Sequence, residues 1–421
     1  MQLKLKTVLN AVHPLKSFVY RDLRIITDES RPPVIHALIK ARKESRPQCS
    51  RCLRRCSAYD HLDTRFFQFV PLWGLAVFLL YSPRRVDCSA CGKIVVEHMP
   101  WANGKSPMTT VFMSFLGTWA RRMSWMEVAR SFGTTWQNVA TAVEWVVAYG
   151  LKHRSLDNIR AIGVDEVMYR AGHKYLTLVY QIDAHCRRLL WITESRKATA
   201  FQQFFTWFGK PRSEALRIVC SDMWAPYLKV IRKHAKFALN ILDKFHIVAH
   251  LNKAVDETRR RDAAELRRQG DDVTLKHSRW CLLKRTSNLT KKQRGRLREL
   301  LRVNLRTVRA YLLKEAFTRF WTYTSPTWAG KFLDQWCDDT LRSGIEPMKA
   351  KARMLRKHRG LILNYFVAKK EFSSSVVEGL NNKLRTVTKR SFGFRQLNTI
   401  KLALFHTLGR LPEPEHTHRF A

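Results

Sequence analysis

The sequence predicts an α/β protein whose mixed sheet follows a β-rich metal-binding region and a helix-turn-helix, and which also contains a long basic helical segment. Three observations lead to this fold class. Short β-branched runs alternate with helical spacing between residues 159 and 242, two C-x-x-C pairs precede them, and helical spacing dominates residues 247–370. The 421 residues carry 76 Lys and Arg against 34 Asp and Glu, a net charge of +42, which indicates a polyanionic partner. A hydrophobic content of 45% excludes a disordered basic tail.

The first hundred residues are predicted to form a β-rich region around a structural zinc ion. Residues 18–26 and 34–39 have the apolar content of strands. Two C-x-x-C knuckles can each present two thiolates to one tetrahedral ion, and nine cysteines without a regular framework favour a reducing compartment over secretion. The predicted ligands are Cys49, Cys52, Cys88 and Cys91, with Cys56 as an alternative ligand and four unligated cysteines as the other interpretation. The flanking arginines indicate exposed turns and are Arg51, Arg54, Arg84 and Arg85.

A helix-turn-helix is predicted over residues 124–149. The first helix ends near Gly133, and the second has Val139, Val143 and Val146 on one face. If the second helix enters a major groove, three polar side chains lie near base edges while neighbouring arginines contact phosphates. These side chains are Thr135, Gln137 and Asn138 for the bases and Arg121, Arg122 and Arg130 for the phosphates. An αα-hairpin that binds no DNA is the alternative interpretation.

The sheet is predicted from five strands and two helices. The strands lie at residues 159–167, 175–182, 188–193, 216–220 and 237–242, and the helices at 197–209 and 225–233. In this order the first and fourth strands lie side by side, which brings Asp165 and Asp222 to one edge of the sheet, where carboxylate oxygens suit Mg²⁺. Glu378, at the start of a later helix, is the third candidate acid. The alternatives are turn-forming aspartates and a capping box of Ser375 with Glu378.

Two neighbouring acids are expected to stay outside this group. Glu166 points to the opposite side of its strand from Asp165, and Asp243 leaves the fifth strand, one strand farther away. Along the helix that follows Glu378, Asn382 and Arg385 lie one and two turns further on the same face, where they can contact DNA phosphates.

The segment from residue 251 to residue 370 is helical and basic, with 30 Lys or Arg against 12 Asp or Glu. We expect its cations to track phosphates. Trp321, Trp328 and Trp336 follow near-heptad spacing and either pack between helices or stack on an unpaired base. The longest apolar run, residues 70–81, contains Pro71 and Gly74 and is far shorter than the ~18–20 residues of a membrane span, so no membrane partner is expected.

Several motifs together resemble transposases of the ISL3 insertion-sequence family, and the resemblance runs over almost the whole chain. It is carried by the cysteine knuckles with Pro71-Leu72-Trp73-Gly74 and Arg84-Arg85-Val86-Asp87-Cys88, by Ile162-Gly163-Val164-Asp165-Glu166, by Asp243-Lys244-Phe245-His246, by residues 286–290 with the basic helices after them, and by Val377-Glu378-Gly379-Leu380-Asn381-Asn382-Lys383 followed by Lys389-Arg390-Ser391-Phe392-Gly393-Phe394. The last string is the most specific. The first knuckle departs from the family pattern, because Ser50 and Leu53 stand where relatives usually carry Pro and Gly.

The resemblance implies a fold, a chemistry and a set of partners. The implied fold has a β-rich zinc-binding domain at residues 1–105, a helix-turn-helix at 106–152, an RNase H-like catalytic core at 153–250 and 371–410, and a basic helical insertion at 251–370. Its D-D-E acids match Asp165, Asp222 and Glu378, which would hold Mg²⁺ or Mn²⁺ for DNA cleavage and strand transfer, with Asp243 and His246 in a supporting role.

The implied partner is double-stranded DNA, both the ends of the element and the target, bound by a homodimer at the nucleoid of a bacterial cytoplasm. Two other functions stay open. A site-specific DNA-binding regulator with a degenerate RNase H-like domain would keep the zinc site and the helix-turn-helix but would cut nothing. An RNase H-type nuclease would keep the acids but would need neither module for sequence recognition.

Overall fold

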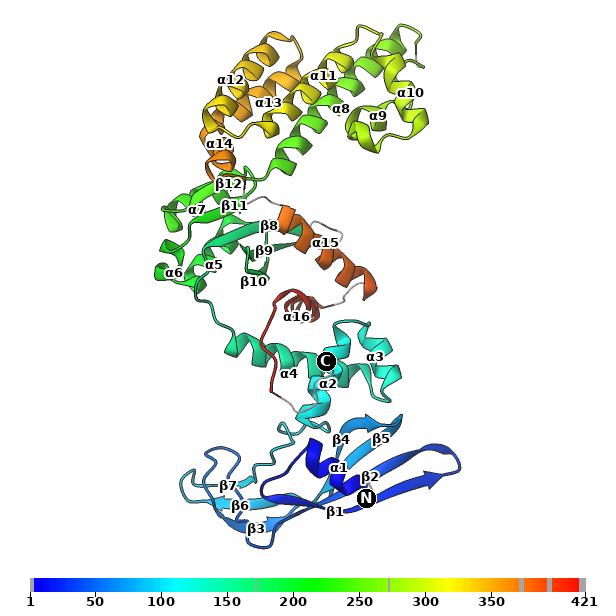
Figure 1. The fold of residues 1–421 in the computed structure, drawn as a ribbon, viewed down its shortest axis with the longest axis vertical. Helices are drawn as coiled ribbons and strands as arrows, with labels where there is room; N and C mark the ends of the chain where they lie inside the picture. The colour runs from blue at the N-terminus through cyan, green and yellow to red at the C-terminus, as the bar shows by residue number, and fades with distance from the viewer. Residues whose placement is uncertain are drawn as a thin grey trace. The chain divides into compact units, whose positions relative to one another are not determined.

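The computed structural model describes residues 4–170, 172, 174–271, 273–370, 375–391 and 396–415 (Figure 1). Within these residues the chain forms two compact units. One unit runs from the start of the described chain to Ser155 and includes the residues from Leu384 on, and the other spans Leu156–Lys383. No described helix is long and apolar enough to cross a membrane. Residues 392–394 of the most specific motif lie outside the described residues.

The first unit begins with helix α1 (Leu5–Val12) and a four-stranded sheet in the order β1-β2-β5-β4. Its strands are β1 (Phe18–Asp28), β2 (Arg31–Ala41), β4 (Arg65–Leu72) and β5 (Leu75–Tyr81), so the two strands predicted at the start of the chain are confirmed. The sheet packs on a core that contains the fully buried side chains of Tyr20, Phe67 and Trp101. Alternate residues of β5 are buried, which is typical of a strand with one face in a core.

A second sheet of this unit contains β3 (Ser57–His61), β6 (Arg84–Cys88) and β7 (Lys93–Val96) in the order β3-β6-β7. Glu97, directly after β7, is buried and accepts hydrogen bonds from the Tyr81 hydroxyl at 2.6 Å and from Nη2 of Arg84 at 2.7 Å. The arginines beside the knuckles, which suggest exposed turns, therefore include one that is largely enclosed. Arg84 lies in β6 with 11% of its side chain exposed, because a buried carboxylate needs a cationic partner.

Four helices complete the first unit: α2 (Thr110–Ala120), α3 (Trp125–Ser131), α4 (Trp136–His153) and α16 (Leu397–Leu408) (Figure 1). The two helices predicted over residues 124–149 are α3 and α4, and Gly133 in the turn between them has a φ of +58°, which suits glycine. α16 packs on α4 with Ile400 and Leu404 buried. The sequence-based division places this helix with residues 371–410 instead, because an apolar helix face does not reveal which distant helix covers it.

His406 of α16 is buried in this helical core, with 3% of its surface exposed. Desolvation lowers the pKa of His406 to about 3, and the positive charges of Arg121 and Arg390 act in the same direction. In the unfolded chain the pKa of a histidine is about 6.5, so the unfolded state binds the proton first as the pH falls.

We therefore expect His406 to lower the free energy of unfolding of this unit as the pH falls from about 6 to about 3, by about 1.4 kcal/mol per pH unit. His406→Leu should remove this dependence, and the same substitution at the exposed His61 should leave it in place. Thermal unfolding measured from pH 7 to pH 4 checks the prediction. A pH dependence that is unchanged in His406→Leu would contradict it.

The second unit is built on a five-stranded mixed sheet in the order β10-β9-β8-β11-β12. Its strands are β8 (Ala161–Arg170), β9 (Lys174–Asp183), β10 (Cys186–Glu194), β11 (Ile218–Ser221) and β12 (Leu239–Leu242). β8 pairs with β9 antiparallel and with β11 parallel, so the five predicted strands and the adjacency of the first and fourth are confirmed.

Three helices lie between β10 and β12 along the chain. They are α5 (Ala198–Phe208) and the short α6 (Lys210–Glu214), both before β11, and α7 (Ala225–His234), after β11. α5 and α7 are the two helices that the sequence predicts, and they cover one face of the sheet (Figure 1). Phe201, Phe204 and Tyr227 pack there against Ile162 and Val164 of β8. Because successive strand residues alternate between faces, Gly163 and Asp165 must belong to the opposite face.

A helical segment follows β12 and comprises α8 (Lys244–Arg268), α9 (Arg279–Leu283), α10 (Lys291–Leu300), α11 (Arg306–Thr318), α12 (Pro326–Arg342), α13 (Glu346–Lys357) and α14 (Arg359–Val367), before α15 (Ser375–Arg390) returns to the sheet (Figure 1). Trp336 is 4% exposed and its indole N–H donates to the Leu313 carbonyl. Of the two interpretations of Trp336, packing between helices is therefore confirmed and stacking on a base is wrong. Trp321 packs edge-on against Phe317. Trp328 is 60% exposed.

Candidate active site

One strand, the ends of two others and the start of one helix carry the candidate acids of the second unit. Asp165 lies in β8, Asp222 directly follows β11, Asp243 directly follows β12, and Glu378 lies in the first turn of α15. β8 continues to Arg170, so Asp165 lies within its strand and not at the end where the sequence places it. The strand is longer than expected because its hairpin partner β9 pairs with it along this whole length.

α15 approaches β8 closely because Gly163 has no side chain. A Cβ at Gly163 would overlap the side chain of Val377 on α15. One turn further along the helix, Asn381 is buried, and its Nδ2 donates to Oδ2 of Asp165 at 2.5 Å. The Tyr180 hydroxyl of β9 donates to Oδ1 of the same asparagine at 2.8 Å. This hydrogen-bonded chain fixes the Asp165 carboxylate and anchors the first turns of α15 on the sheet.

Asn381 is absent from the residues that the sequence predicts for this site. The available signal is its position three residues after Glu378, which puts both side chains on neighbouring positions of one helix face. Asn382 and Arg385, which the sequence predicts as phosphate contacts, are exposed on the same helix. The side chain of Ser375 lies outside the described side chains, so its capping box with Glu378 does too.

His246 supplies positive charge to this acidic region. Its Nδ1 lies 3.0 Å from Oδ2 of Asp243, and this hydrogen bond raises the pKa of His246 to about 9, with the charges of Asp243, Asp165 and Asp222 adding to the rise. At neutral pH the imidazole is therefore protonated and donates to Asp243. Burial raises the pKa of Asp165 above its usual range, against the hydrogen bond from the Glu166 N–H and the charge of His246.

Glu166 alternates with Asp165 and so belongs to the face of β8 that α7 covers, while Asp222 lies in the turn between β11 and α7. The Asp222 carboxylate accepts the N–H of Trp224 at 3.0 Å, which is the turn-forming contact named above as its alternative. Burial raises the pKa of Glu166, a hydrogen bond with Tyr227 opposes that rise, and the charge of Asp222 adds to it. Glu166 thus shares the electrostatic surroundings of Asp222, which strand alternation alone does not indicate.

These carboxylates offer the oxygen ligands that Mg²⁺ or Mn²⁺ takes. Burial, the main cause of the raised pKa of Asp165, disfavours its bare negative charge, and a bound cation would stabilise that charge. Among the described residues, only the four cysteines bring at least three ligand atoms within 4.8 Å of one another. Asp165, Asp222 and Glu378 therefore stand farther apart than the thiolates do.

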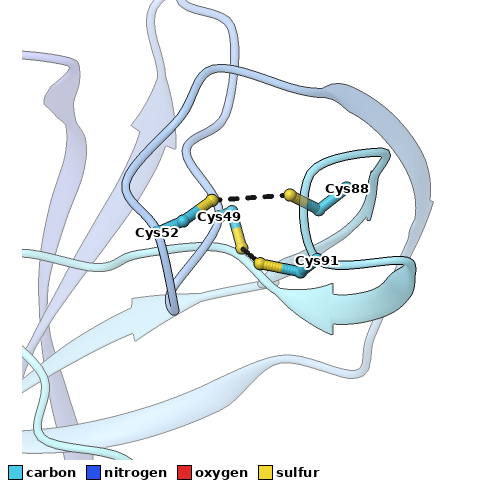
Figure 2. Close-up of side chains that lie close together, drawn as sticks. All are labelled: Cys49, Cys52, Cys88 and Cys91. Carbon is cyan, nitrogen blue, oxygen red and sulfur yellow. Dashed lines mark hydrogen bonds between the residues drawn. The ribbon is translucent and has the colours of Figure 1, made fainter.

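The four predicted cysteines come together in the first unit, beside the β3-β6-β7 sheet (Figure 2). The Sγ atoms of Cys49 and Cys91 lie 3.9 Å apart, and those of Cys52 and Cys88 lie 3.5 Å apart. A tetrahedral zinc ion with Zn–S bonds of ~2.3 Å separates its sulfurs by about 3.8 Å. The spacing therefore fits Zn²⁺. The alternative ligand, Cys56, is not in this cluster, and its thiol donates to the Arg54 carbonyl.

Each of the two knuckles ends in a turn, and the two turns have the same geometry. The N–H of Leu53 donates to the Cys49 carbonyl at 2.9 Å, and the N–H of Gly92 donates to the Cys88 carbonyl at 2.8 Å. Both residues have a φ of about +60°, which glycine adopts freely and leucine adopts at a cost. The substitution of Gly by Leu53 in the first knuckle therefore leaves the turn in place but strains its backbone.

We expect Leu53→Gly to raise the free energy of unfolding of the zinc-bound protein by roughly 0.5–1 kcal/mol, because it removes this strain at a small entropic cost. The Leu53 side chain is 55% exposed, so its loss removes little packing. Calorimetry of both proteins with zinc present measures the difference. Gly92→Leu should shift the melting temperature in the opposite direction, and a destabilised Leu53→Gly protein would contradict the prediction.

Some polar side chains of the helix-turn-helix form hydrogen bonds within the motif itself. The Thr135 hydroxyl accepts the Asn138 N–H at 3.1 Å as the N-cap of α4, and Nδ2 of Asn138 donates to Oγ1 of Thr134 at 3.0 Å. Two of the three side chains predicted to meet bases therefore hold the start of α4. Gln137, the third, is exposed.

The three arginines predicted to contact phosphates in this region differ in their exposure and in their partners within the protein. The Arg121 guanidinium forms an ion pair with Glu413, so its charge is partly neutralised within the protein. Arg122 and Arg130 are exposed. These two arginines are therefore the better placed of the three to meet an anionic partner.

Sequence comparisons relate this chain to proteins of known description. Residues 162–404, more than half of the chain, match the sequence model of the ISL3 family of DDE proteins, which is described as Transposase. A transposase for insertion sequence element IS1001 from Bordetella parapertussis is 28% identical over 349 residues, 82% of this chain and 85% of that protein. A transposase for insertion sequence element IS1557 from Mycobacterium tuberculosis is 28% identical over 427 aligned positions, 94% of each chain.

Proposed function

The chain belongs to the ISL3 family of transposases, and from this premise we propose that it binds the ends of an insertion sequence and catalyses metal-dependent DNA strand cleavage and strand transfer there. The observation that carries the proposal is the anchoring of α15 on β8. The Asp165–Asn381 hydrogen bond links a buried strand acid to the helix that carries Glu378. The parallel pairing of β8 with β11 supports an RNase H-like core, because it puts Asp222 at the same sheet edge.

Within this proposal, Asp165, Asp222 and Glu378 hold Mg²⁺ or Mn²⁺. Bound there, the ions would activate a water or a 3′ hydroxyl for attack and stabilise the charge that develops on the scissile phosphate. The residues around them do the positioning. Asn381 fixes the Asp165 carboxylate, and protonated His246, held by Asp243, offsets the repulsion among the aspartates. No side chain needs to form a covalent intermediate with DNA.

The other parts of the chain fit the recognition of DNA. We propose that the zinc-binding region at 1–105 and the helix-turn-helix at 106–152 recognise the element ends, while the helical insertion at 251–370 contacts phosphates without regard to sequence. A net charge of +42 supports a polyanionic partner. Two chains acting as a homodimer would let both ends of an element be cut in one complex.

Incubation of the purified protein with labelled element-end DNA and Mg²⁺ tests the proposed function, and we expect nicks at a defined position at the element end. Intact sequence-specific binding without any cutting would instead favour a site-specific DNA-binding regulator with a degenerate catalytic domain. Cutting of structured nucleic acid without regard to the end sequence would favour an RNase H-type nuclease.

Gln137 and Arg130 should separate sequence recognition from general affinity within one helix-turn-helix. Gln137→Ala should reduce the preference for element ends over random DNA by ~1–3 kcal/mol, because a lost base contact weakens only the specific complex. Arg130→Gln should weaken both complexes alike and reduce the slope of log K against log salt by ~0.9, because a phosphate contact carries no sequence information. Titrations by fluorescence anisotropy at several salt concentrations measure both. Equal losses on both DNAs for Gln137→Ala would contradict a base contact.

A further inference from the structure

A cleft of about 790 Å³ opens in the helical segment of the second unit, and the candidate acids do not line it. Its walls come from α9, from α10 and from the chain before α9. The described lining carries several cations, Lys276, His277 when protonated, Arg279, Lys292 and Arg296, against the single acid Glu299. Glu299 is already paired with Arg296 at 3.0 Å. The cleft therefore has the charge of an anion site and a volume typical of a small-ligand site.

A tryptophan supplies an aromatic surface in this cleft. Trp280 lines it and is 53% exposed, although a tryptophan in a helical protein is usually buried to a greater extent. The Arg279 guanidinium lies over its ring, 5.0 Å from the centroid. A planar aromatic ligand can stack on such a ring, and its anionic group can reach the lysines beside it.

The glycine in the opposite wall has no explanation in the packing of the helix. Gly295 lies in the middle of α10, where glycine costs about 1 kcal/mol relative to alanine. No heavy atom lies within 4 Å of the position that a Cβ at Gly295 would take, so a side chain would meet open space and no neighbour. Because Gly295 lines the cleft, a side chain at this position would take up space beside it.

We propose that this cleft binds one unpaired nucleotide of the DNA strand that the protein processes. Its base stacks on Trp280, its phosphate is held by Lys276 and Lys292, and the flat wall at Gly295 leaves room for it. A paired base is excluded, because a base within a duplex presents no free face to a side chain in a cleft of this size. The proposal rests on the proposed function for the identity of the ligand as DNA, and it names a site that the catalytic acids do not include.

Trp328 offers a matched control for Trp280. It is also an exposed tryptophan of the helical segment, 60% exposed, and Lys331 lies over its ring at 4.6 Å, but it does not line the cleft. A binding effect that arose from any exposed tryptophan beside a cation would therefore appear in both variants. One that arose from the cleft would appear only at Trp280.

The test measures binding of the full zinc-bound chain to a labelled oligo(dT) and to a blunt duplex, by fluorescence anisotropy in buffer without Mg²⁺ or Mn²⁺ so that no cleavage occurs. We expect Trp280→Ala to weaken oligo(dT) binding by about 5- to 150-fold, the loss that ~1–3 kcal/mol of base stacking corresponds to, and to leave duplex binding unchanged. Trp328→Ala should change neither. Equal effects of the two variants, or no effect of Trp280→Ala, would overturn the proposal. So would a Trp280→Ala protein that keeps its affinity for oligo(dT) but loses affinity for thymidine monophosphate, because the cleft would then serve a free nucleotide.

Gly295→Ala provides a second test that does not depend on a damaged fold. This substitution should raise the melting temperature, because alanine favours the helix, and should still weaken oligo(dT) binding, because its methyl group enters the cleft. A stabilised protein with unchanged oligo(dT) affinity would overturn the role of the flat wall. Because these measurements need no catalytic metal and no cutting, their failure would leave the cleavage proposal standing. If cleavage failed instead, the binding results could still be interpreted.

Discussion

Replacing Asp165 by Asn should abolish DNA cleavage and leave DNA binding intact. The amide keeps the size of the carboxylate and an oxygen acceptor for the Asn381 N–H, but it removes the charge that a divalent cation needs. We expect cleavage to fall by at least about 10³-fold, on the scale of essential active-site groups, and Asp222→Asn and Glu378→Gln to do the same. Double substitutions should be no worse than single ones, because groups that act as one unit are not additive. The measurement is the nicking rate on labelled element-end DNA with Mg²⁺.

Asp339→Asn is the matched control, because Asp339 is an exposed acid on α12 whose carboxylate accepts a hydrogen bond from Gln335 of the same helix. It should cut at the normal rate. Asp243→Asn should slow cleavage without abolishing it, because it lowers the pKa of His246 and removes charge near the site, but removes no proposed metal ligand. A Glu378→Gln protein that still nicks at an appreciable rate would remove Glu378 from the site and favour its role in capping α15.

Removing the zinc ligands should have the second large effect, this time on folding. Cys49→Ser combined with Cys88→Ser takes one ligand from each knuckle, and zinc content should fall from about one ion per chain to none, since a closed site needs all four ligands. Zinc binding contributes roughly 10–16 kcal/mol in zinc-finger peptides, as much as a whole domain gains on folding, so we expect the β3-β6-β7 sheet to unfold. Metal analysis and amide hydrogen exchange measure the two outcomes.

Cys56→Ser is the control for this experiment. Cys56 lies close to the knuckles in sequence but outside the sulfur cluster, so its loss should change neither the zinc content nor the protection of the sheet. Hydrogen exchange in the second unit, residues 156–383, should be unaffected by either variant, because that unit has its own core. Unchanged zinc content in the double variant would exclude the four-cysteine site.

The elements of the second unit are predictable from sequence because their signals are local. The five strands are short β-branched runs bounded by turns, and their β-β-β-α-β-α-β order permits few topologies, so the pairing of β8 with β11 could be expected before the structure was known. That pairing brings the strand of Asp165 beside the strand that ends just before Asp222. The length of β8 does not follow from that pairing, because it depends on how far β9 pairs with it.

The parts that escape prediction depend on contacts between residues far apart in the chain. The Asp165–Asn381 hydrogen bond joins residues 216 positions apart, and nothing near either residue indicates it. Arg84 looks like a surface arginine until Glu97 is seen to be buried beside it. Thr135 and Asn138 carry hydroxyl and amide groups of the kind that contact bases. The same groups can instead form hydrogen bonds at the start of a helix, as they do here.

The packing of α16 on α4 has a consequence for how this protein is made. The two helices share a core, but 243 residues separate the end of α4 at His153 from the start of α16 at Leu397. At about 5–20 residues per second, a ribosome needs roughly 12–50 s to synthesise that stretch. During this time the nascent helix-turn-helix lacks the helix that covers part of its core. A chain still on the ribosome, or one cut short before residue 397, therefore packs α4 on α2 and α3 without α16, and the α4 surface that α16 covers stays open until the chain is almost complete.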